Sequence, residues 1–339
     1  MAKMEEKAHP SFSAFFKGSL LPILEKLERF RMLRFAAYGI ILAGVAALWL
    51  AGAHRLGMPY QHRILGLLWI AWGGIFLVGI TWFFRAFDLA VLRVHEKRGL
   101  FSRGVVGPTV RRAAPRLKHL PGEFISLTDF IACGLFTPDF VVAEGRDLFY
   151  GGGKGYTLTF SWLRLVKPRR FLKLPGLRRG LENHGGREIF AGWYFVVNFP
   201  RNFRGETVVM PDVAESQMSW LGRMVQEATA RDVVLHLEDA EFEVLFKAVS
   251  SGELEGRYVL TPIFMRSAVA AGKALGGKMY LSFRDNQMFV IVPFPSRHFE
   301  LTANQPFIDL RYCRKLYRMT RGVLDMAEAV AAHQTVWRT

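Results

Sequence analysis

Residues 35–53 read FAAYGIILAGVAALWLAGA and residues 64–84 read ILGLLWIAWGGIFLVGITWFF, two runs without a Lys, Arg, Asp or Glu. About 20 apolar residues in a helix cross the roughly 30 Å hydrocarbon core of a bilayer. Only residues 54–63 separate the runs, so the chain must turn back at once. The sequence therefore predicts a two-helix transmembrane hairpin. The alternative is a buried helical hairpin in a soluble core, but two uncharged runs of this length rarely occur there.

Basic residues flank this hairpin on both sides. Lys and Arg recur through residues 3–34 and again through residues 85–118, whereas the turn holds only Arg55 and Arg63. Because an excess of Lys and Arg marks the cytoplasmic side of a membrane, we expect both termini to be cytoplasmic. The formal net charge of +16 agrees with a position beside an anionic leaflet, which makes the lipid bilayer the first expected partner.

The cysteines agree with a cytoplasmic location. Cys133 and Cys313 are the only two, and they lie far apart in the chain. A disulfide or zinc framework needs more cysteines at closer spacing. We expect two reduced, partly buried thiols.

Periodicity and turn residues divide the chain into five parts. They are an amphipathic N-terminal helix (1–34), the hairpin (35–84), a basic juxtamembrane helix and linker (85–122), an α+β cytoplasmic domain (123–303) and a C-terminal helix (304–339). Within 85–122 the helix is expected at 86–98 and the linker at 99–122. The α+β class follows from strands that come in short groups rather than in regular βαβ alternation. Strands are expected at 156–165, 188–199, 207–210, 233–237, 256–260, 279–283 and 288–293, and helices at 125–135, 216–229, 239–246, 261–274 and 307–332.

Ordered segments of this domain resemble a known family. They are DLFYGGGKGYTLTF (147–160), IFAGWYFVVNFPRNFRGETVVMPD (189–212), LEDAEFEVLFKAVSSGELEGRYVLTPIFM (237–265), YLSFRDNQMFVIVPF (280–294) and FE (299–300). Over roughly residues 123–300 the chain resembles the uncharacterised bacterial membrane protein family catalogued as domain of unknown function 3137. The resemblance implies a multi-pass protein of the bacterial cytoplasmic (inner) membrane, and it brings no established activity.

Two segments are candidates for anion contact. The first is a basic stretch without acids, which Pro168 and Pro175 keep from forming a helix, so we expect an exposed basic loop. It is a solvated charge run, a contact for anionic lipid headgroups or a contact for nucleic acid, and its residues are Arg164, Lys167, Arg169, Arg170, Lys173, Arg178 and Arg179. The second is a glycine-rich turn with Gly152, Gly153 and Lys154, which is either structural or an anion site made by backbone N–H groups.

Motifs for catalysis, metals and nucleic acids are missing from the sequence. It has no His-Glu-x-x-His, no Gly-x-Ser-x-Gly and no nucleotide P-loop, and it has no signature of a nucleic-acid-binding module. The acidic group at 238–243 is expected to stabilise the first turn of a helix rather than to bind a metal. We therefore predict no catalytic residues, no metal site, no cofactor and no nucleic-acid partner.

These observations favour a non-catalytic adaptor or assembly component at the membrane, which binds a protein partner or associates with itself. An aromatic strand supplies the candidate interface residues Trp193, Tyr194, Phe195 and Phe199, provided that they are exposed. Two alternatives stay open. One is a sensor of anionic lipid headgroups, and the other is an enzyme whose site comes from residues distant in sequence.

Overall fold

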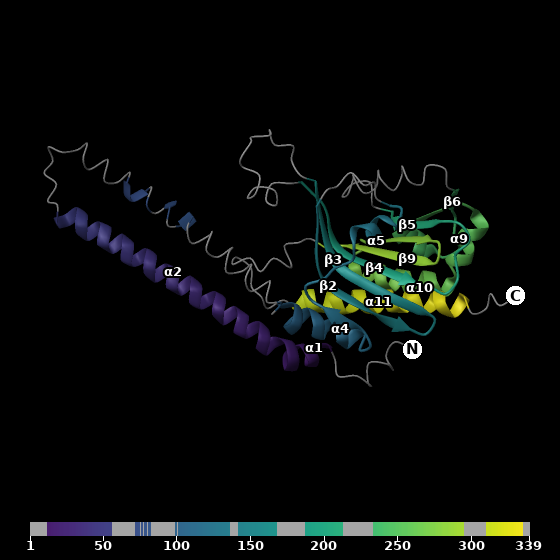
Figure 1. The fold of residues 1–339 in the computed structure, drawn as a ribbon, viewed down its shortest axis with the longest axis horizontal. Coiled ribbons are helices and arrows are strands. Elements are labelled where there is room, and N and C mark those ends of the chain that lie inside the picture. The colour runs from purple at the N-terminus through teal and green to yellow at the C-terminus, as the bar shows by residue number, and fades with distance from the viewer. Residues whose placement is uncertain are drawn as a thin grey trace. The chain divides into compact units, whose positions relative to one another are not determined.

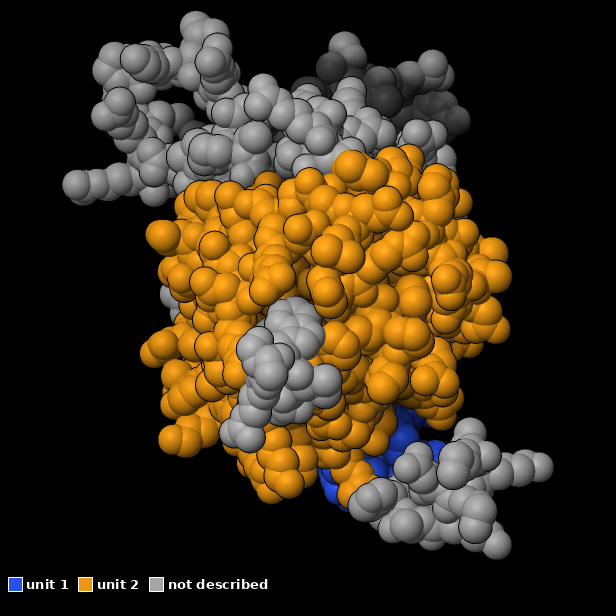
Figure 2. Space-filling model, turned by 90° about the vertical axis from the view of Figure 1, so that its right-hand side faces the viewer, with its two compact units in different colours: residues 1–101, 301–310 blue, residues 102–300, 311–339 orange. Residues whose placement is uncertain are grey.

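In this computed structural model, the described residues are 12–55, eight residues between 72 and 82, Gly99, and residues 101–135, 142–167, 187–212, 233–294 and 310–334. The chain, drawn as a ribbon in Figure 1, divides into two compact units, which have different colours in Figure 2. Unit 1 contains residues 1–101 and 301–310. Unit 2 contains residues 102–300 and 311–339.

Helices make up the described part of unit 1. They are α1 (Phe12–Phe15), the π-helical turn η2 (Phe16–Leu20) and α2 (Leu21–Arg55). The helix expected before residue 35 is therefore confirmed, and it continues through the first apolar run. The π-helical turn ends just before Pro22, whose missing N–H removes one hydrogen bond from the helix.

The predicted transmembrane hairpin is confirmed only in the helical state of its first run. Most of the second run (64–84) and residues 56–63 of the turn lie outside the described residues, as does the helix expected at 86–98. Within the part of the chain that is described, no helix has both the length and the apolar character needed to cross a membrane. The hairpin thus stays a prediction.

A linker expected at 99–122 is wrong for most of its length. These residues form a π-helical turn η4 (Ser102–Val106), helix α4 (Gly107–Ala113) and strand β1 (Lys118–Leu120). Val105, Val106 and Val110 are fully buried. Pro108 does not break the helix, because it lies at the start of α4, where a missing N–H has no intrahelical partner to lose.

The described residues of unit 2 form one sheet of nine strands in the order β1-β2-β3-β4-β9-β8-β5-β7-β6. Every adjacent pair is antiparallel. The other strands are β2 (Val142–Gly153), β3 (Tyr156–Lys167), β4 (Arg187–Asn198), β5 (Thr207–Pro211), β6 (Val233–Leu235), β7 (Phe246–Ser250), β8 (Tyr280–Arg284) and β9 (Gln287–Pro293). The mixed α+β class is confirmed.

Five α-helices follow α4 among the described residues, and four of them were predicted. Those four are α5 (Leu127–Ile131), α8 (Ala240–Leu245), α10 (Pro262–Leu275) and α11 (Leu310–Gln334). The strand expected at 256–260 is wrong, because α9 (Glu253–Val259) occupies that position. Gly256 of α9 lies so close to Leu235 and Ser250 that a larger side chain would clash. The helix expected at 216–229 lies outside the described residues.

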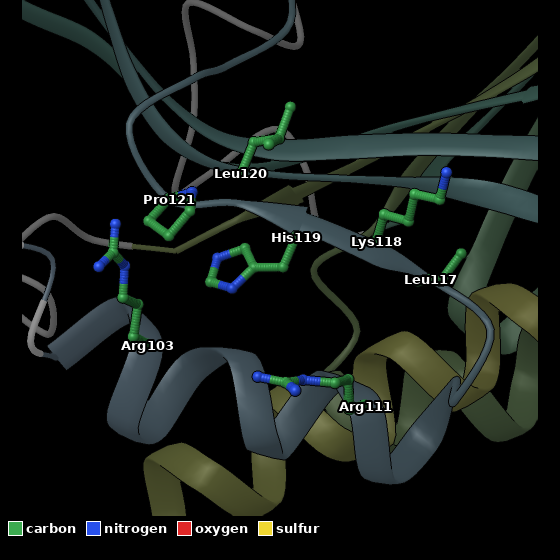
Figure 3. Close-up of a pocket in the computed structure, with 7 residues that line it drawn as sticks. All are labelled: Arg103, Arg111, Leu117, Lys118, His119, Leu120 and Pro121. Atoms are coloured by element: carbon green, nitrogen blue, oxygen red, sulfur yellow. The ribbon is translucent and has the colours of Figure 1, made fainter.

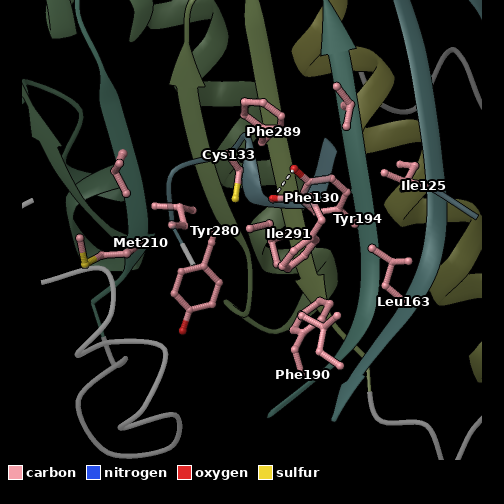
Figure 4. Packing of buried hydrophobic residues seen from close by; sticks show 14 of the residues in the cluster. Ile125, Phe130, Cys133, Leu163, Phe190, Tyr194, Met210, Tyr280, Phe289 and Ile291 are labelled. Carbon is pink, nitrogen blue, oxygen red and sulfur yellow. Dashed lines mark hydrogen bonds between the residues drawn. The ribbon is translucent and has the colours of Figure 1, made fainter. Parts of the chain in front are cut away.

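The two faces of the sheet are covered by different helices. On one face, Phe130 and Cys133 in and beside α5 pack among Leu163, Tyr194 and Phe289 (Figure 4). On the other face, Phe264 of α10 meets Phe283 of β8 edge-on, with ring centroids 5.4 Å apart. Helix α11 packs beside α10, since Gly322 leaves room for Ala271 (Figure 1). Further large aromatic side chains are fully buried in the core: Trp193, Phe149, Phe160, Phe190, Phe195, Phe242 and Phe246.

Candidate anion-binding pocket

A pocket of about 550 Å³ opens between the η4–α4 helix and strand β1 (Figure 3). Its lining is basic and apolar, and none of these seven described residues is acidic: Arg103, Arg111, Leu117, Lys118, His119, Leu120 and Pro121. Arg103 and Arg111 project from the helix, and the His119 ring projects from the strand toward them. The volume falls within the range of small-molecule sites, about 300–1,000 Å³.

His119 is fixed at this pocket by a buried acid. Its Nε2 lies 2.8 Å from Oδ1 of Asp147, and the two side chains are only 7% and 1% exposed. The imidazole also stacks on Phe149, with ring centroids 4.2 Å apart and planes within 5° of each other. The ring therefore has one well-defined orientation, set by a hydrogen bond at its edge and by an aromatic core residue on its face.

Asp147 occupies an unusual backbone position. Its φ is 60°, in the left-handed region, where Asp is one of the few tolerated non-glycine residues. The position coincides with a register shift between β2 and β3, at Arg146 and Phe149. Such bulges re-aim side chains, and here the carboxylate is directed at His119. Its second oxygen, Oδ2, is buried without a hydrogen-bond partner among the described residues.

Gly107 lets the ring approach the helix. A Cβ at this position would lie 2.8 Å from Nδ1 and 3.2 Å from Cε1 of His119, which is tighter than side-chain packing permits. The glycine is therefore required by the close contact of α4 with the ring and not by its own backbone angles.

Arginine charges at this pocket are available to a ligand. Both Arg103 and Arg111 are exposed, and neither has an acidic partner within the described part of the chain. Lys118 lines the pocket too, although its side chain points away from His119 in Figure 3 and its Nζ lies 5.8 Å from the Tyr150 ring centroid. Asp147 offsets one of these three positive charges, so the local balance stays positive.

The predicted basic loop is only partly described, and its first residues are not in a loop. Arg164 and Lys167 belong to strand β3, which pairs with β2 and β4. Arg164 forms ion pairs with Glu188 at 2.9 Å and Glu144 at 3.5 Å, so its charge is already matched by protein. The remaining candidates lie outside the described residues: Arg169, Arg170, Lys173, Arg178 and Arg179.

The glycine-rich turn is a β-hairpin between β2 and β3. Gly152 and Gly153 are still strand residues, and Gly153 pairs with Tyr156 across a turn made by Lys154 and Gly155. Gly155 has a φ of 80°, which explains the need for glycine there. Lys154 is exposed at the tip. These features give the turn a structural role, and whether it also binds an anion stays a prediction.

The interface predicted on the aromatic strand is wrong, because its four side chains are buried in the core. Trp193, Tyr194 and Phe195 are 0% exposed and Phe199 is 3% exposed. The physical reason is that β4 is an interior strand between β3 and β9, with helices on both faces, so residues on both of its sides are buried.

The acidic group at 238–243 and the two cysteines stabilise the fold or lie in its core. Asp239 caps α8 by accepting a hydrogen bond from the Phe242 N–H at 3.0 Å, and Glu241 pairs with Lys273 at 2.7 Å. Both cysteines are buried, and no disulfide joins them. Burial raises the pKa of the Cys133 thiol to about 11, which keeps it protonated near neutral pH.

Strands β4 to β9 with helices α8 to α10 contain three of the five segments on which the family resemblance rests: 189–212, 237–265 and 280–294. Residues 188–331 match the family described as Protein of unknown function (DUF3137). The resemblance is thereby confirmed. The DUF3137 match begins at β4 and extends through most of α11, so it leaves out the segment at 147–160 and the whole lining of the His119 pocket. No curated protein and no solved structure matches the chain.

The sequence does not predict the pocket. Arg103 and Arg111 lie in a basic stretch that indicates juxtamembrane charge, and His119 belongs to no recognised motif. One signal was present, since Val105, Val106 and Val110 form an apolar set between basic residues, which is typical of a helix with one buried face. The His119–Asp147 pair had no signal, because it joins residues that only a strand register brings together.

Proposed function

We propose that the chain is a membrane-anchored binding protein of the bacterial cytoplasmic membrane, in which residues 35–84 form the anchor and unit 2 is a non-catalytic cytoplasmic module. The single observation that carries this proposal is the pair of uncharged runs, the first of which is helical over its full length. Both termini are expected on the cytoplasmic side, since both flanks of the runs are basic.

Exposed apolar side chains support the anchor. On α2, Ile40 is 72% exposed, and in the second run Trp72 and Trp82 are 72% and 73% exposed. Large apolar surfaces facing water are costly, at about 25 cal/mol per Å². A hydrocarbon surrounding removes that cost, which is why lipid is the neighbour we propose for this part of unit 1.

A binding role for unit 2 is supported by its surface rather than by its aromatic strand. Val233 and Val234 are 48% and 43% exposed on β6, which is an edge strand of the described sheet, and Leu254 on α9 is 61% exposed. Open edges and exposed apolar side chains are typical of association with another protein chain. A protein partner or a second copy therefore belongs to the proposal.

Membrane extraction tests the anchor directly. The full chain, expressed in a bacterial host, is expected to stay in the membrane fraction after alkaline carbonate and to be released only by detergent. A cysteine placed in the turn at 54–63 is expected to react with an impermeant maleimide from the outside, whereas one placed before residue 34 is not. Release by carbonate alone, or the same labelling at both positions, contradicts the proposal.

Partner binding is a separate measurement. The protein is purified in a gentle detergent from its own host, and its mass and bound components are determined together. A stoichiometric second protein, or a defined oligomer of this chain, supports the adaptor role. A monomer that retains only anionic lipid favours the second candidate, a headgroup binder, for which the basic lining of the His119 pocket is the specific observation.

A further inference from the structure

We propose that the pocket beside His119 binds the phosphate group of a small anionic ligand, with Arg103 and Arg111 as the residues that contact it. The ligand is a soluble phosphate ester or the phosphate of a lipid headgroup, since both present the same chemistry. The proposal deepens the binding role given above by assigning it a site and a ligand class.

The charge arrangement carries the first step of the argument. Two guanidinium groups line one pocket without acidic partners among the described residues, and both are exposed on the η4–α4 helix. Both attract an anion that enters the pocket. Arginine is the side chain best suited to phosphate, because its planar fork donates two parallel hydrogen bonds.

The second step is that the pocket is held in shape. His119 is immobilised by its bond to Asp147 and by stacking on Phe149, and Phe149 continues into the aromatic core through Phe160, 4.9 Å away between centroids. A rigid wall lowers the entropy lost on binding. The buried dyad is thus the fixed side of the site, and the exposed arginines are the adaptable side.

The third step concerns size. A volume of about 550 Å³ exceeds what a lone phosphate ion fills, and Leu117 and Pro121 add apolar lining to the pocket. This combination suits a phosphate attached to a carbon skeleton. The sequence adds that only residues 85–102 separate the second apolar run from Arg103, so the pocket lies in the chain directly after the proposed anchor.

Calorimetry with glycerol 3-phosphate on the full-length protein in neutral detergent tests the soluble arm. Native mass spectrometry after incubation with phosphatidylglycerol or with phosphatidylcholine tests the lipid arm. R103Q/R111Q is expected to weaken the relevant binding at least tenfold, and R103K/R111K is expected to keep part of it. The matched control is R204Q/R318Q, which removes two exposed arginines outside the pocket and should change binding less than twofold.

A second variant tests whether binding depends on the shape of the pocket and not only on the net charge of the protein. Gly107→Ala adds a methyl group against the His119 ring and should weaken binding while the protein's charge is unchanged. Melting temperatures of all variants are measured, so that loss of fold is recognised. Glycerol phosphate binding lost in R103Q/R111Q assigns a soluble ligand, and loss of phosphatidylglycerol alone assigns a lipid one.

Other outcomes overturn the inference. They are the absence of binding to both probes by the wild-type chain, or an equal loss in R103Q/R111Q and R204Q/R318Q. If the phosphate-binding proposal is contradicted, the membrane-anchor proposal still stands, since these variants should still need detergent for extraction. If the anchor proposal is contradicted, glycerol phosphate binding can still be measured.

Discussion

Tyr194 shows how a single side chain ties the α5 segment to the sheet. It is fully buried, and its hydroxyl donates to the carbonyl oxygens of Asp129 at 3.1 Å and Phe130 at 3.3 Å. The centroid of its ring lies 4.8 Å from that of the Phe130 ring. Tyr194→Phe keeps the ring and leaves carbonyls without this donor, so we expect a loss of about 1–2 kcal/mol in unfolding free energy.

Thermal unfolding of the purified protein measures this loss. Tyr150→Phe is the control, because Tyr150 is 36% exposed and its hydroxyl can exchange its bonds with water. A melting temperature for Tyr194→Phe equal to that of Tyr150→Phe would show that the hydroxyl bond contributes nothing measurable.

Cys133 provides a second prediction at this scale. With a pKa raised to about 11 by burial, about 0.1% of the thiol is ionised at pH 8 in the folded protein. In a Cys313→Ala background, Cys133 should therefore react with a maleimide at least tenfold more slowly before unfolding than after it. Equal rates would mean that the thiol is accessible in the native state.

The same thiol predicts a pH dependence of stability. Its folded pKa of about 11 lies above the value of 9.0 for an unperturbed thiol, so the unfolded chain releases the proton first. The stabilisation is complete below pH 9 and is lost as the pH rises from 9 to 11, by up to about 3 kcal/mol. Comparison of denaturant unfolding of Cys133→Ala with wild type across this range checks it, since the variant should show a shallower decline.

At the scale of elements, α10 is the helix whose ends are best defined. Thr261 accepts a hydrogen bond from the Phe264 N–H at 3.3 Å, and Gly276 ends the helix with a φ of 72°. Thr261→Ala should lower stability by about 1 kcal/mol, and Thr261→Ser should restore most of it, because serine supplies the same oxygen. Thermal unfolding of the two variants separates the cap from the loss of a methyl group.

Elements with local start and stop signals were the ones that the sequence predicted. Helix α10 has both signals, and the β8–β9 hairpin has Asp285 and Asn286 at its turn. The strand predicted at 256–260 was wrong, and α9 lies there instead. The aromatic and β-branched residues beside Gly256 favour a strand locally. What decides in favour of a helix is its packing onto Leu235 and Ser250, which lie far away in sequence or on another element.

The candidate site was less predictable than the fold for a related reason. Arg103 and Arg111 were visible as charge, but their common pocket depends on α4 packing beside β1. The His119–Asp147 bond depends on a strand register and on a bulge in β2. The interface predicted on the aromatic strand was wrong because these side chains are buried. A local pattern of aromatic residues does not reveal whether a strand lies at the edge or in the interior of a sheet.

At the scale of the whole molecule, the boundary of unit 2 has a measurable consequence. A fragment of residues 102–339 keeps η4, α4 and β1, whereas a fragment of residues 123–339 starts at the boundary suggested by composition. The shorter fragment loses Val105, Val106 and Val110, each fully buried, and exposes the edge of β2 that β1 covers at residues 148–150. At about 1.5–3 kcal/mol for each valine, the loss is a large fraction of the 5–15 kcal/mol that stabilises a typical domain.

We therefore expect fragment 102–339 to be soluble with a cooperative thermal transition, and fragment 123–339 to melt at least 10 °C lower or to aggregate through its open edge strand. Circular dichroism melting and limited proteolysis of both fragments provide the measurement. Equal melting temperatures would mean that the α4–β1 segment adds no stability to the sheet. In that case the α4–β1 segment, which forms the pocket beside His119, would pack on the rest of unit 2 without stabilising it.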